Sequence, residues 1–193
     1  MSLSSKMVSS IPAGVTGQSA VSQFVWMIGF AAATALGARI EIPHEPVPYT
    51  LQTLIVLLAG AFLGPRNGAI SQAMYLAAGL LGAPVFAGGG FGLVRILGPT
   101  GGYLLAFPIA AAVVGFMQQE RRSLLWSFIS MTSGLLVIFA AGTAQLYAVY
   151  FRDWAEAFGA GFLIFSWWDM LKLSAAAMIY HEVSKRWTRV PRE

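Results

Sequence analysis

Apolar residues in this chain gather into six blocks, separated by short breaks that are rich in proline, glycine or charge. A helix rises about 1.5 Å per residue, so about 20 apolar residues cross the roughly 30 Å hydrocarbon core of a bilayer. The blocks therefore predict six transmembrane helices, at residues 21–40, 49–64, 69–83, 99–119, 123–150 and 161–180.

The breaks between the blocks carry residues that end helices. IPHEPVP at 42–48 holds three prolines, GPRNG at 64–68 predicts a tight turn, and a charged Glu-Arg-Arg triplet follows at 120–122. The second and third blocks have 16 and 15 residues and reach only about 24 and 22 Å as straight helices. We expect these two to be steeply placed, extended into their flanks or partly re-entrant, and the long fifth block to be tilted or partly interfacial.

The composition is that of a membrane protein. Of the 193 residues, 57% are hydrophobic and 10% are charged, whereas about 25% are charged in soluble domains. We predict an all-α integral membrane protein, a compact six-transmembrane-helix bundle at 21–180 with a glycine-rich outer loop. Residues 1–20 lack the apolar core of a secretory signal and predict a flexible cytoplasmic N-terminus, and residues 181–193 predict a basic cytoplasmic tail.

Lysine and arginine are distributed unevenly between the two sides of this predicted bundle. Six helices place both termini on one side, together with the breaks at 64–68 and 120–122. That side carries eight basic residues, which are Lys6, Arg66, Arg121, Arg122, Lys185, Arg186, Arg189 and Arg192. The other side carries three, which are Arg39, Arg95 and Arg152. The positive-inside rule predicts a multi-pass protein of the cell inner (plasma) membrane with both termini cytoplasmic. We interpret the net charge of +4 as this topology signal and predict no nucleic-acid partner.

Glycine is concentrated between residues 79 and 102, where nine of the 21 glycines lie. This density lets the backbone adopt tight turns that other residues do not take. The segment is either a flexible outer loop or a shaped cap that forms a pocket wall. The chain has no GxxxxGK[ST] phosphate loop, so we expect no nucleotide site and no ATPase of its own.

Asp169 and Lys172 are two charges inside the sixth block. A spacing of three residues places both on one helix face, and, counted from Gly161, Asp169 lies about 12 Å deep. A charge at the bilayer centre costs at least about 2.5–3.5 kcal/mol. The pair is therefore either an ion pair that holds the bundle together or the polar floor of a ligand cavity.

The cavity interpretation predicts the chemistry of the ligand. Lys172 offers an ammonium group to a carboxylate, and Asp169 accepts from N–H groups. A small amphipathic acid with a urea or amide group satisfies both. Apolar walls are predicted at Phe86, Tyr103, Trp167 and Trp168; lipid-facing packing is an equal alternative for the two tryptophans.

Four stretches of this sequence resemble the BioY family, the biotin-specific substrate-binding components of energy-coupling factor transporters. They are PYTLQTLIVLLAGAFLG at 48–64, GAPVFA at 82–87 with the glycines that follow, GPTGGYLLAFP at 98–108, and Asp169-x-x-Lys172. They occur in the family's order and extend over residues 37–180. GPTGGYL with the downstream DxxK is a specific combination.

The resemblance implies a six-helix membrane protein that captures biotin with high affinity from outside the cell. It implies that Asp169 faces the ureido ring and that Lys172 either serves the carboxylate or orients Asp169. Further binding residues implied nearby are Gln52, Tyr103, Phe86, Gly88 and Gly89. Family members often carry an arginine within the glycine run, where this chain has none. Arg95 lies five residues beyond the run. Two roles are possible for Arg95, a contact with the ligand carboxylate and a surface role.

The resemblance also implies partners, which are a transmembrane coupling subunit and two ATPase subunits beside membrane lipid. The family's coupling surface includes an AxxxA motif, matched here by Ala31 and Ala35; packing within the bundle is the alternative. We expect no cofactor and no metal, because the two histidines are far apart, and no enzyme, because no Ser–His–Asp set can be assembled. The alternative function is a self-sufficient ion-coupled carrier that uses Asp169 and Lys172 as a relay; a structural membrane partner is a third.

Overall fold

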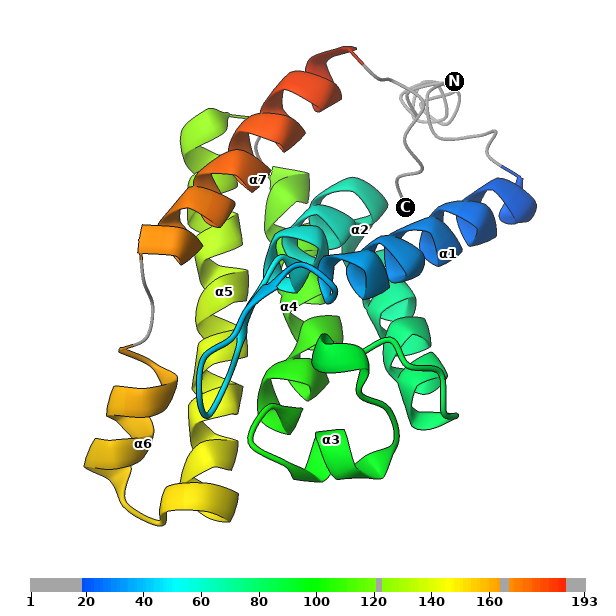
Figure 1. Cartoon of the computed structure of the whole chain (residues 1–193). Helices are drawn as coiled ribbons and strands as arrows, with labels where there is room; N and C mark the ends of the chain where they lie inside the picture. The colour runs from blue at the N-terminus through cyan, green and yellow to red at the C-terminus, as the bar shows by residue number, and fades with distance from the viewer. Residues whose placement is uncertain (1–18, 121–122, 164–166, 187–193) are drawn as a thin grey trace, which may run out of the picture.

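The computed structural model of the chain describes residues 19–120, 123–163 and 167–186. Figure 1 shows its helices and one short hairpin. In chain order they are α1 (Ala20–Gly37), β1 (Glu41–Ile42), β2 (Tyr49–Thr50), α2 (Gln52–Leu80), the 3₁₀ turn η1 (Ala87–Gly89), α3 (Leu93–Leu97), α4 (Gly101–Glu120), α5 (Leu124–Leu146), the π-helical turn η2 (Tyr147–Phe151), α6 (Trp154–Gly161) and α7 (Trp167–Arg186). The predictions for residues 1–18 and for the tail beyond Arg186 lie outside the described residues.

Helix α2 joins the second and third predicted helices, so the turn predicted at 64–68 is wrong in its extent. Only Gly64 leaves the helical conformation, with φ 82° and ψ 177°. Glycine adopts this positive φ without the steric cost of a Cβ atom, and Pro65, which has no N–H group, suits the start of a second helical arm. The chain therefore bends at the predicted break and forms two arms without a separate loop (Figure 1).

The last predicted helix, at 161–180, is wrong in its limits. Gly161 is the last residue of α6, whereas α7 begins at Trp167 and continues to Arg186. Asp169 consequently lies in the first turn of α7, and the first six residues of the predicted tail belong to that helix. Residues 161–168 are apolar except for Ser166, so the hydrophobic pattern alone could not locate the start of α7.

Helix α4 lies at the centre of the bundle, between α2 and α5 (Figure 1). The buried side chains between these helices include Val56, Leu63, Ala110, Val114 and Ile138, none of which is accessible to solvent. Small residues allow this packing: a Cβ atom on Gly60 would lie 2.2 Å from the carbonyl oxygen of Ala111.

Four helical segments in the described part of the chain are long and apolar enough to cross a membrane. They are Ala20–Gly37, Gln52–Leu80, Gly101–Glu120 and Leu124–Phe151. Many apolar side chains point outward from them; on α1, Val21, Val25 and Leu36 are between 60% and 72% exposed. Such surfaces suit contact with lipid.

The hairpin and the glycine-rich segment lie together at one end of the bundle. The hairpin pairs Glu41 with Thr50 and Ile42 with Tyr49. The segment predicted as a glycine-rich loop contains η1 and the short helix α3. In Figure 1, α3 lies at the lower end of the bundle, away from the start of α1 and the end of α7. This end carries most of the candidate site.

Candidate functional site

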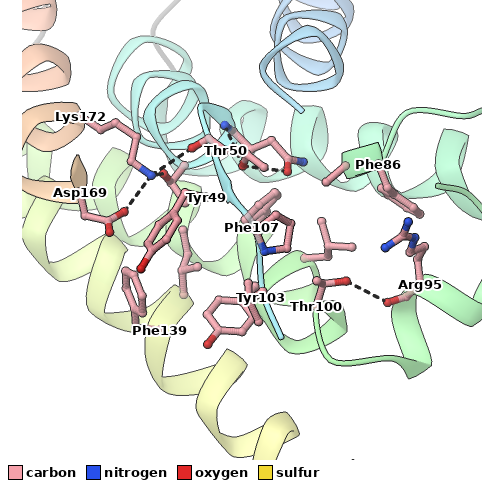
Figure 2. A pocket seen from close by; sticks show the side chains of 17 residues that line it. Tyr49, Thr50, Phe86, Arg95, Thr100, Tyr103, Phe107, Phe139, Asp169 and Lys172 are labelled. Carbon is pink, nitrogen blue, oxygen red and sulfur yellow. Dashed lines mark hydrogen bonds and ion pairs between the residues drawn. The ribbon is translucent and has the colours of Figure 1, made fainter. Parts of the chain in front are cut away.

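A pocket opens between the hairpin, the glycine-rich segment and five helices (Figure 2). Its lining comes from seven parts of the chain, which are the hairpin with Tyr49 and Thr50, α2 with Gln52 and Thr53, the glycine-rich segment with Phe86 and Ala87, α3 with Arg95, α4 with Tyr103 and Phe107, α5 with Ile138 and Phe139, and α7 with Asp169 and Lys172. Six of the eight predicted substrate-binding residues therefore line one pocket, together with Ala87 of η1, the neighbour of Gly88.

Asp169 and Lys172 form a buried ion pair at one end of this pocket. The Lys172 Nζ atom lies 2.8 Å from Asp169 Oδ1, and the side chains are only 6% and 3% exposed. The predicted placement of both charges on one helix face is thereby confirmed. Burial of two charges costs several kcal/mol per ion unless other groups compensate, so the remaining partners of Lys172 matter.

Lys172 donates to two further groups, both from the segment at the start of α2. Its ammonium group lies 3.0 Å from the carbonyl oxygen of Thr50 and 2.9 Å from the hydroxyl oxygen of Thr53. An ammonium group has three N–H donors, and Asp169, Thr50 and Thr53 supply three acceptors. This geometry holds Lys172 in place and positions the neighbouring carboxylate of Asp169.

The Thr50 carbonyl reaches Lys172 because the chain turns sharply into α2. The Leu51 N–H donates to the carbonyl oxygens of Gly37 and Ile40, which fixes the strand to the end of α1. Buried Gln52 follows; its side-chain oxygen accepts from the Thr50 hydroxyl at 3.0 Å, and its amide nitrogen donates to the Tyr75 hydroxyl. The predicted site residue Gln52 therefore lies at the pocket wall and also joins the two arms of α2.

Aromatic side chains form the apolar walls of the pocket. The Tyr103 hydroxyl donates to the carbonyl oxygen of Gly161 at 2.8 Å, which leaves its ring against the pocket. Phe86 is 1% exposed and meets Tyr75 edge-on at 5.5 Å between ring centroids. Phe107 of α4 stacks on the same tyrosine at 6.3 Å. Such rigid apolar walls with a few polar groups are typical of small-molecule sites.

Arg95 lies at the opposite end of the pocket from Asp169 and Lys172 (Figure 2). Its side chain packs over the glycine run; a Cβ atom on Gly90 would lie 2.2 Å from Arg95 Nε. Within the described residues, Arg95 takes part in no ion pair. Arg95 thus places a guanidinium group at the pocket, five positions beyond the glycine run in which the family resemblance implies an arginine.

The glycine run itself is held by side chains from the start of the hairpin. The Gly88 N–H donates to Glu41 Oε2 at 2.9 Å, and Arg39 donates to the carbonyl oxygen of Pro84. Gly88 and Gly89 both have positive φ, 64° and 71°, a conformation that favours glycine. The two predicted glycines therefore form a shaped backbone turn beside Arg95.

Several predicted residues lie away from the pocket. Trp167 is 74% exposed, and neither it nor Trp168 lines the pocket, so of the two interpretations left open for the tryptophans the pocket wall is wrong. Ala31 and Ala35 are half-buried and pack against the core; a docking role for them stays a prediction. The described residues hold no cluster of three or more His, Cys, Asp or Glu side chains that could bind a metal ion.

Sequence reasoning missed the two threonines that hold Lys172, Thr50 and Thr53. Both lie in the quoted stretch PYTLQT, but their distance from Lys172, 122 and 119 residues, gives no local signal. Tyr49 was missed as well. Burial, and to a smaller extent the charge of Asp169, raise the pKa of the Tyr49 hydroxyl above its ordinary value.

Comparison with known proteins gives a consistent result. The sequence model of the BioY family matches residues 7–189. The biotin transporter BioY of Thermotoga maritima is 39% identical over 156 residues, which is 81% of this chain and 92% of that protein. The probable biotin transporter BioY of Pyrococcus horikoshii is 41% identical over 150 residues, 78% of this chain and 88% of that protein. A crystal structure of the S-component for biotin from an ECF-type ABC transporter superposes with a TM-score of 0.80 at 25% identity, over 88% of this chain and 95% of that chain.

Proposed function

The chain belongs to the BioY family, and on this basis we propose that it captures biotin with high affinity from outside the cell as the substrate-binding component of an energy-coupling factor transporter. The named function of its relatives and the biotin S-component fold of its structural match support this function. The family is one of transporters, so the chain is a membrane protein and not an enzyme. Ion-coupled carriage, the alternative, finds no counterpart among these relatives.

One observation carries the proposal: the pocket has a buried carboxylate at one end and a guanidinium group at the other, with aromatic walls between them. Biotin has matching chemistry, because its ureido ring donates N–H groups, its bicycle is apolar and its side chain ends in a carboxylate. We assign the ureido N–H groups to Asp169 and the carboxylate to Arg95. Lys172 then orients Asp169, since its three donors already have acceptors within the protein.

The other predicted site residues take supporting roles. Phe86 and Tyr103 contact the apolar part of biotin. Gln52 holds the start of α2 at the pocket through its hydrogen bonds to Thr50 and Tyr75. Gly88 and Gly89 place the backbone close to the ligand, where a side chain would interfere.

We place six membrane crossings in the chain, with α2 crossing twice. Its 29 residues supply two arms of about 20 Å each on either side of Gly64, and α7 forms the sixth crossing. Figure 1 shows α3, at the pocket, far from the start of α1 and the end of α7. The basic residues predict that both termini are cytoplasmic. With that orientation, the pocket opens to the outside of the plasma membrane.

Uptake requires partners, because a bound ligand must still be released inside the cell. We propose a transmembrane coupling subunit and two ATPase subunits; the structural match, an S-component of an ECF-type ABC transporter, supports them. Helix α1 is the candidate contact, with Ala31 and Ala35 on it; small residues allow a second helix to approach closely.

Equilibrium binding of biotin to the purified, detergent-solubilised chain tests the proposal. Asp169→Asn removes the negative charge while it keeps the side-chain shape, and we expect it to abolish tight binding. Glu182→Gln is the matched control, since Glu182 and Lys185 form an exposed ion pair of the same spacing on the same helix, 3.1 Å apart. Absence of biotin binding by the folded wild-type chain, or equal affinity in the Asp169 variant, would overturn the assignment.

A further inference from the structure

The segment that covers the pocket is almost devoid of polar side chains. Residues 80–98, here called the apolar cap, read LLGAPVFAGGGFGLVRILG and contain one polar side chain, that of Arg95. Segments that connect helices on a water-exposed surface normally carry polar residues at their outward positions. The composition of the apolar cap is instead that of a segment in contact with lipid or protein.

The outward face of the cap is strongly apolar. The most exposed side chains are Leu81 (88%), Val94 (82%) and Leu97 (67%), and Phe91 and Leu93 are more than half exposed. Phe86 and Ile96 are buried beneath them, and Arg95 is turned inward onto Gly90. The cap therefore sorts its residues with the charge inside and the large aliphatic groups outside, which is the reverse of a soluble surface.

The backbone of the cap is hydrogen-bonded by side chains from other elements. Gln145 of α5 donates to the carbonyl oxygens of Ile96 at 2.8 Å and Gly98 at 2.6 Å, at the end of α3. The Tyr75 hydroxyl donates to the carbonyl oxygen of Val85 at 3.2 Å, and Arg39 donates to that of Pro84. Irregular backbone at membrane depth requires such partners because lipid supplies none; in water they would be dispensable.

We propose that the apolar cap lies in the membrane boundary at the pocket end of the bundle and contacts lipid through Leu81, Val94 and Leu97. The outward apolar side chains of the cap are continuous with the transmembrane helix α2, whose last residue, Leu80, is 40% exposed. No charged side chain of the cap points outward to bind a polar partner or water. Lipid is therefore a closer match than an aqueous surface, and this assignment does not depend on which ligand the pocket takes.

The absence of cysteine from the chain makes a direct test straightforward. Single variants Leu81→Cys, Val94→Cys and Leu97→Cys of the full chain carry a nitroxide label and are reconstituted into vesicles of phosphatidylethanolamine and phosphatidylglycerol. The accessibility of each label to oxygen, which is enriched in lipid, and to a water-soluble nickel chelate is measured by electron paramagnetic resonance. Ile109→Cys on the exposed face of α4 is the lipid control, and Glu45→Cys at the hairpin tip is the water control.

We expect the three cap labels to match the Ile109 control, with high oxygen and low nickel accessibility. High nickel accessibility, as at Glu45, would place the cap in water and overturn the proposal. Low accessibility to both reagents would mean that protein, and not lipid, covers the three cap side chains, which would overturn the proposal. Dipolar broadening between labels would then identify a second copy of the chain as the covering protein. All substituted side chains are exposed, so the labelled variants are expected to fold.

Discussion

The ammonium group of Lys172 lies 2.9 Å from the hydroxyl oxygen of Thr53, a hydrogen bond that joins α7 to the first turn of α2 across 119 residues of sequence. Together with the Thr50 carbonyl at 3.0 Å, it makes the position of the buried charge pair depend on the hairpin. The ligand pocket and the meeting of these two helices are therefore one structural unit.

Removal of this hydroxyl is expected to weaken both stability and binding. Thr53→Val keeps the shape of the side chain but leaves Lys172 one acceptor short. Interhelical hydrogen bonds in membranes contribute about 0.6 kcal/mol on average and up to about 1.7 kcal/mol. Because this donor is charged, we expect a loss of about 1–2 kcal/mol in unfolding free energy and a several-fold weaker affinity for biotin, measured by denaturation and equilibrium binding.

Thr132→Val is the control for this experiment. The Thr132 hydroxyl donates to the Phe128 carbonyl at 2.7 Å within its own helix, α5, so its removal breaks no contact between helices. If Thr53→Val and Thr132→Val changed stability equally and left affinity intact, the hydrogen bond to Lys172 would have no role in holding the site.

The ion pair itself should show strong coupling in a double-mutant cycle. Asp169→Leu leaves a buried ammonium group without its counter-ion, and Lys172→Met leaves a buried carboxylate; removal of one partner of a buried pair costs about 3–5 kcal/mol. The double variant buries no charge, so we expect it to be more stable than the sum of the single effects implies. Denaturation without biotin measures all four proteins, and additive effects would contradict the pairing at 2.8 Å.

The wall formed by Phe86 should be sensitive to a single methyl group on Gly79. A Cβ atom at Gly79 would lie 2.1 Å from Phe86 Cζ, so Gly79→Ala must displace the buried ring toward the pocket. We expect a roughly tenfold or greater loss of biotin affinity, since displacement of a packed core side chain costs about 1–3 kcal/mol. Equilibrium binding measures it.

Gly159→Ala is the matched substitution for Gly79→Ala. Nothing lies within 4 Å of a Cβ atom on Gly159, and alanine favours the helix that contains it. Its affinity for biotin should equal that of the wild type. An equal loss of affinity in both variants would show that the effect does not pass through Phe86.

The hydrophobic pattern could predict the apolar segments that contain the four candidate spans, because lipid requires each span to satisfy its own backbone. The pairing of Asp169 with Lys172 was also predictable, since a spacing of three residues is a local property of a helix. The start of α7 was not predictable from hydrophobicity, because residues 161–168 are apolar except for Ser166, and the Ser166-x-x-Asp169 spacing typical of a helix start was overlooked. The position of Asp169 in the first turn of α7 was missed for the same reason.

Contacts over long distances in the sequence were beyond prediction from the pattern. Thr50 and Thr53 meet Lys172 only because the hairpin folds back beside α7. The sequence left two interpretations of the glycine-rich segment, a flexible loop and a shaped cap. In the structure this segment contains η1 and α3 and forms hydrogen bonds with four other parts of the chain. Such order depends on partners that no local pattern specifies.

Gln145 is expected to hold the end of the apolar cap in place. Gln145→Met keeps the volume of the side chain but leaves the carbonyl groups of Ile96 and Gly98 without the donor that now lies 2.8 and 2.6 Å away. The Gly98 carbonyl group keeps the Gly101 N–H as a donor, so the loss falls mainly on Ile96. An unpaired buried carbonyl group costs about 1–3 kcal/mol, and the junction between α3 and α4 should therefore open more often. Hydrogen exchange measures this as faster exchange of amides at residues 93–101.

Gln118→Met separates this local effect from a general loss of stability. Gln118 is a buried glutamine at the other end of α4, where it donates to Ser130 of α5 at 2.8 Å. We expect it to speed exchange near its own position and to spare the cap. Because Arg95 and Phe86 are positioned by the cap, Gln145→Met should also release biotin faster, whereas Gln118→Met should not. Equal exchange at 93–101 in the wild type and Gln145→Met would show that lipid or packing, and not Gln145, keeps the cap ordered.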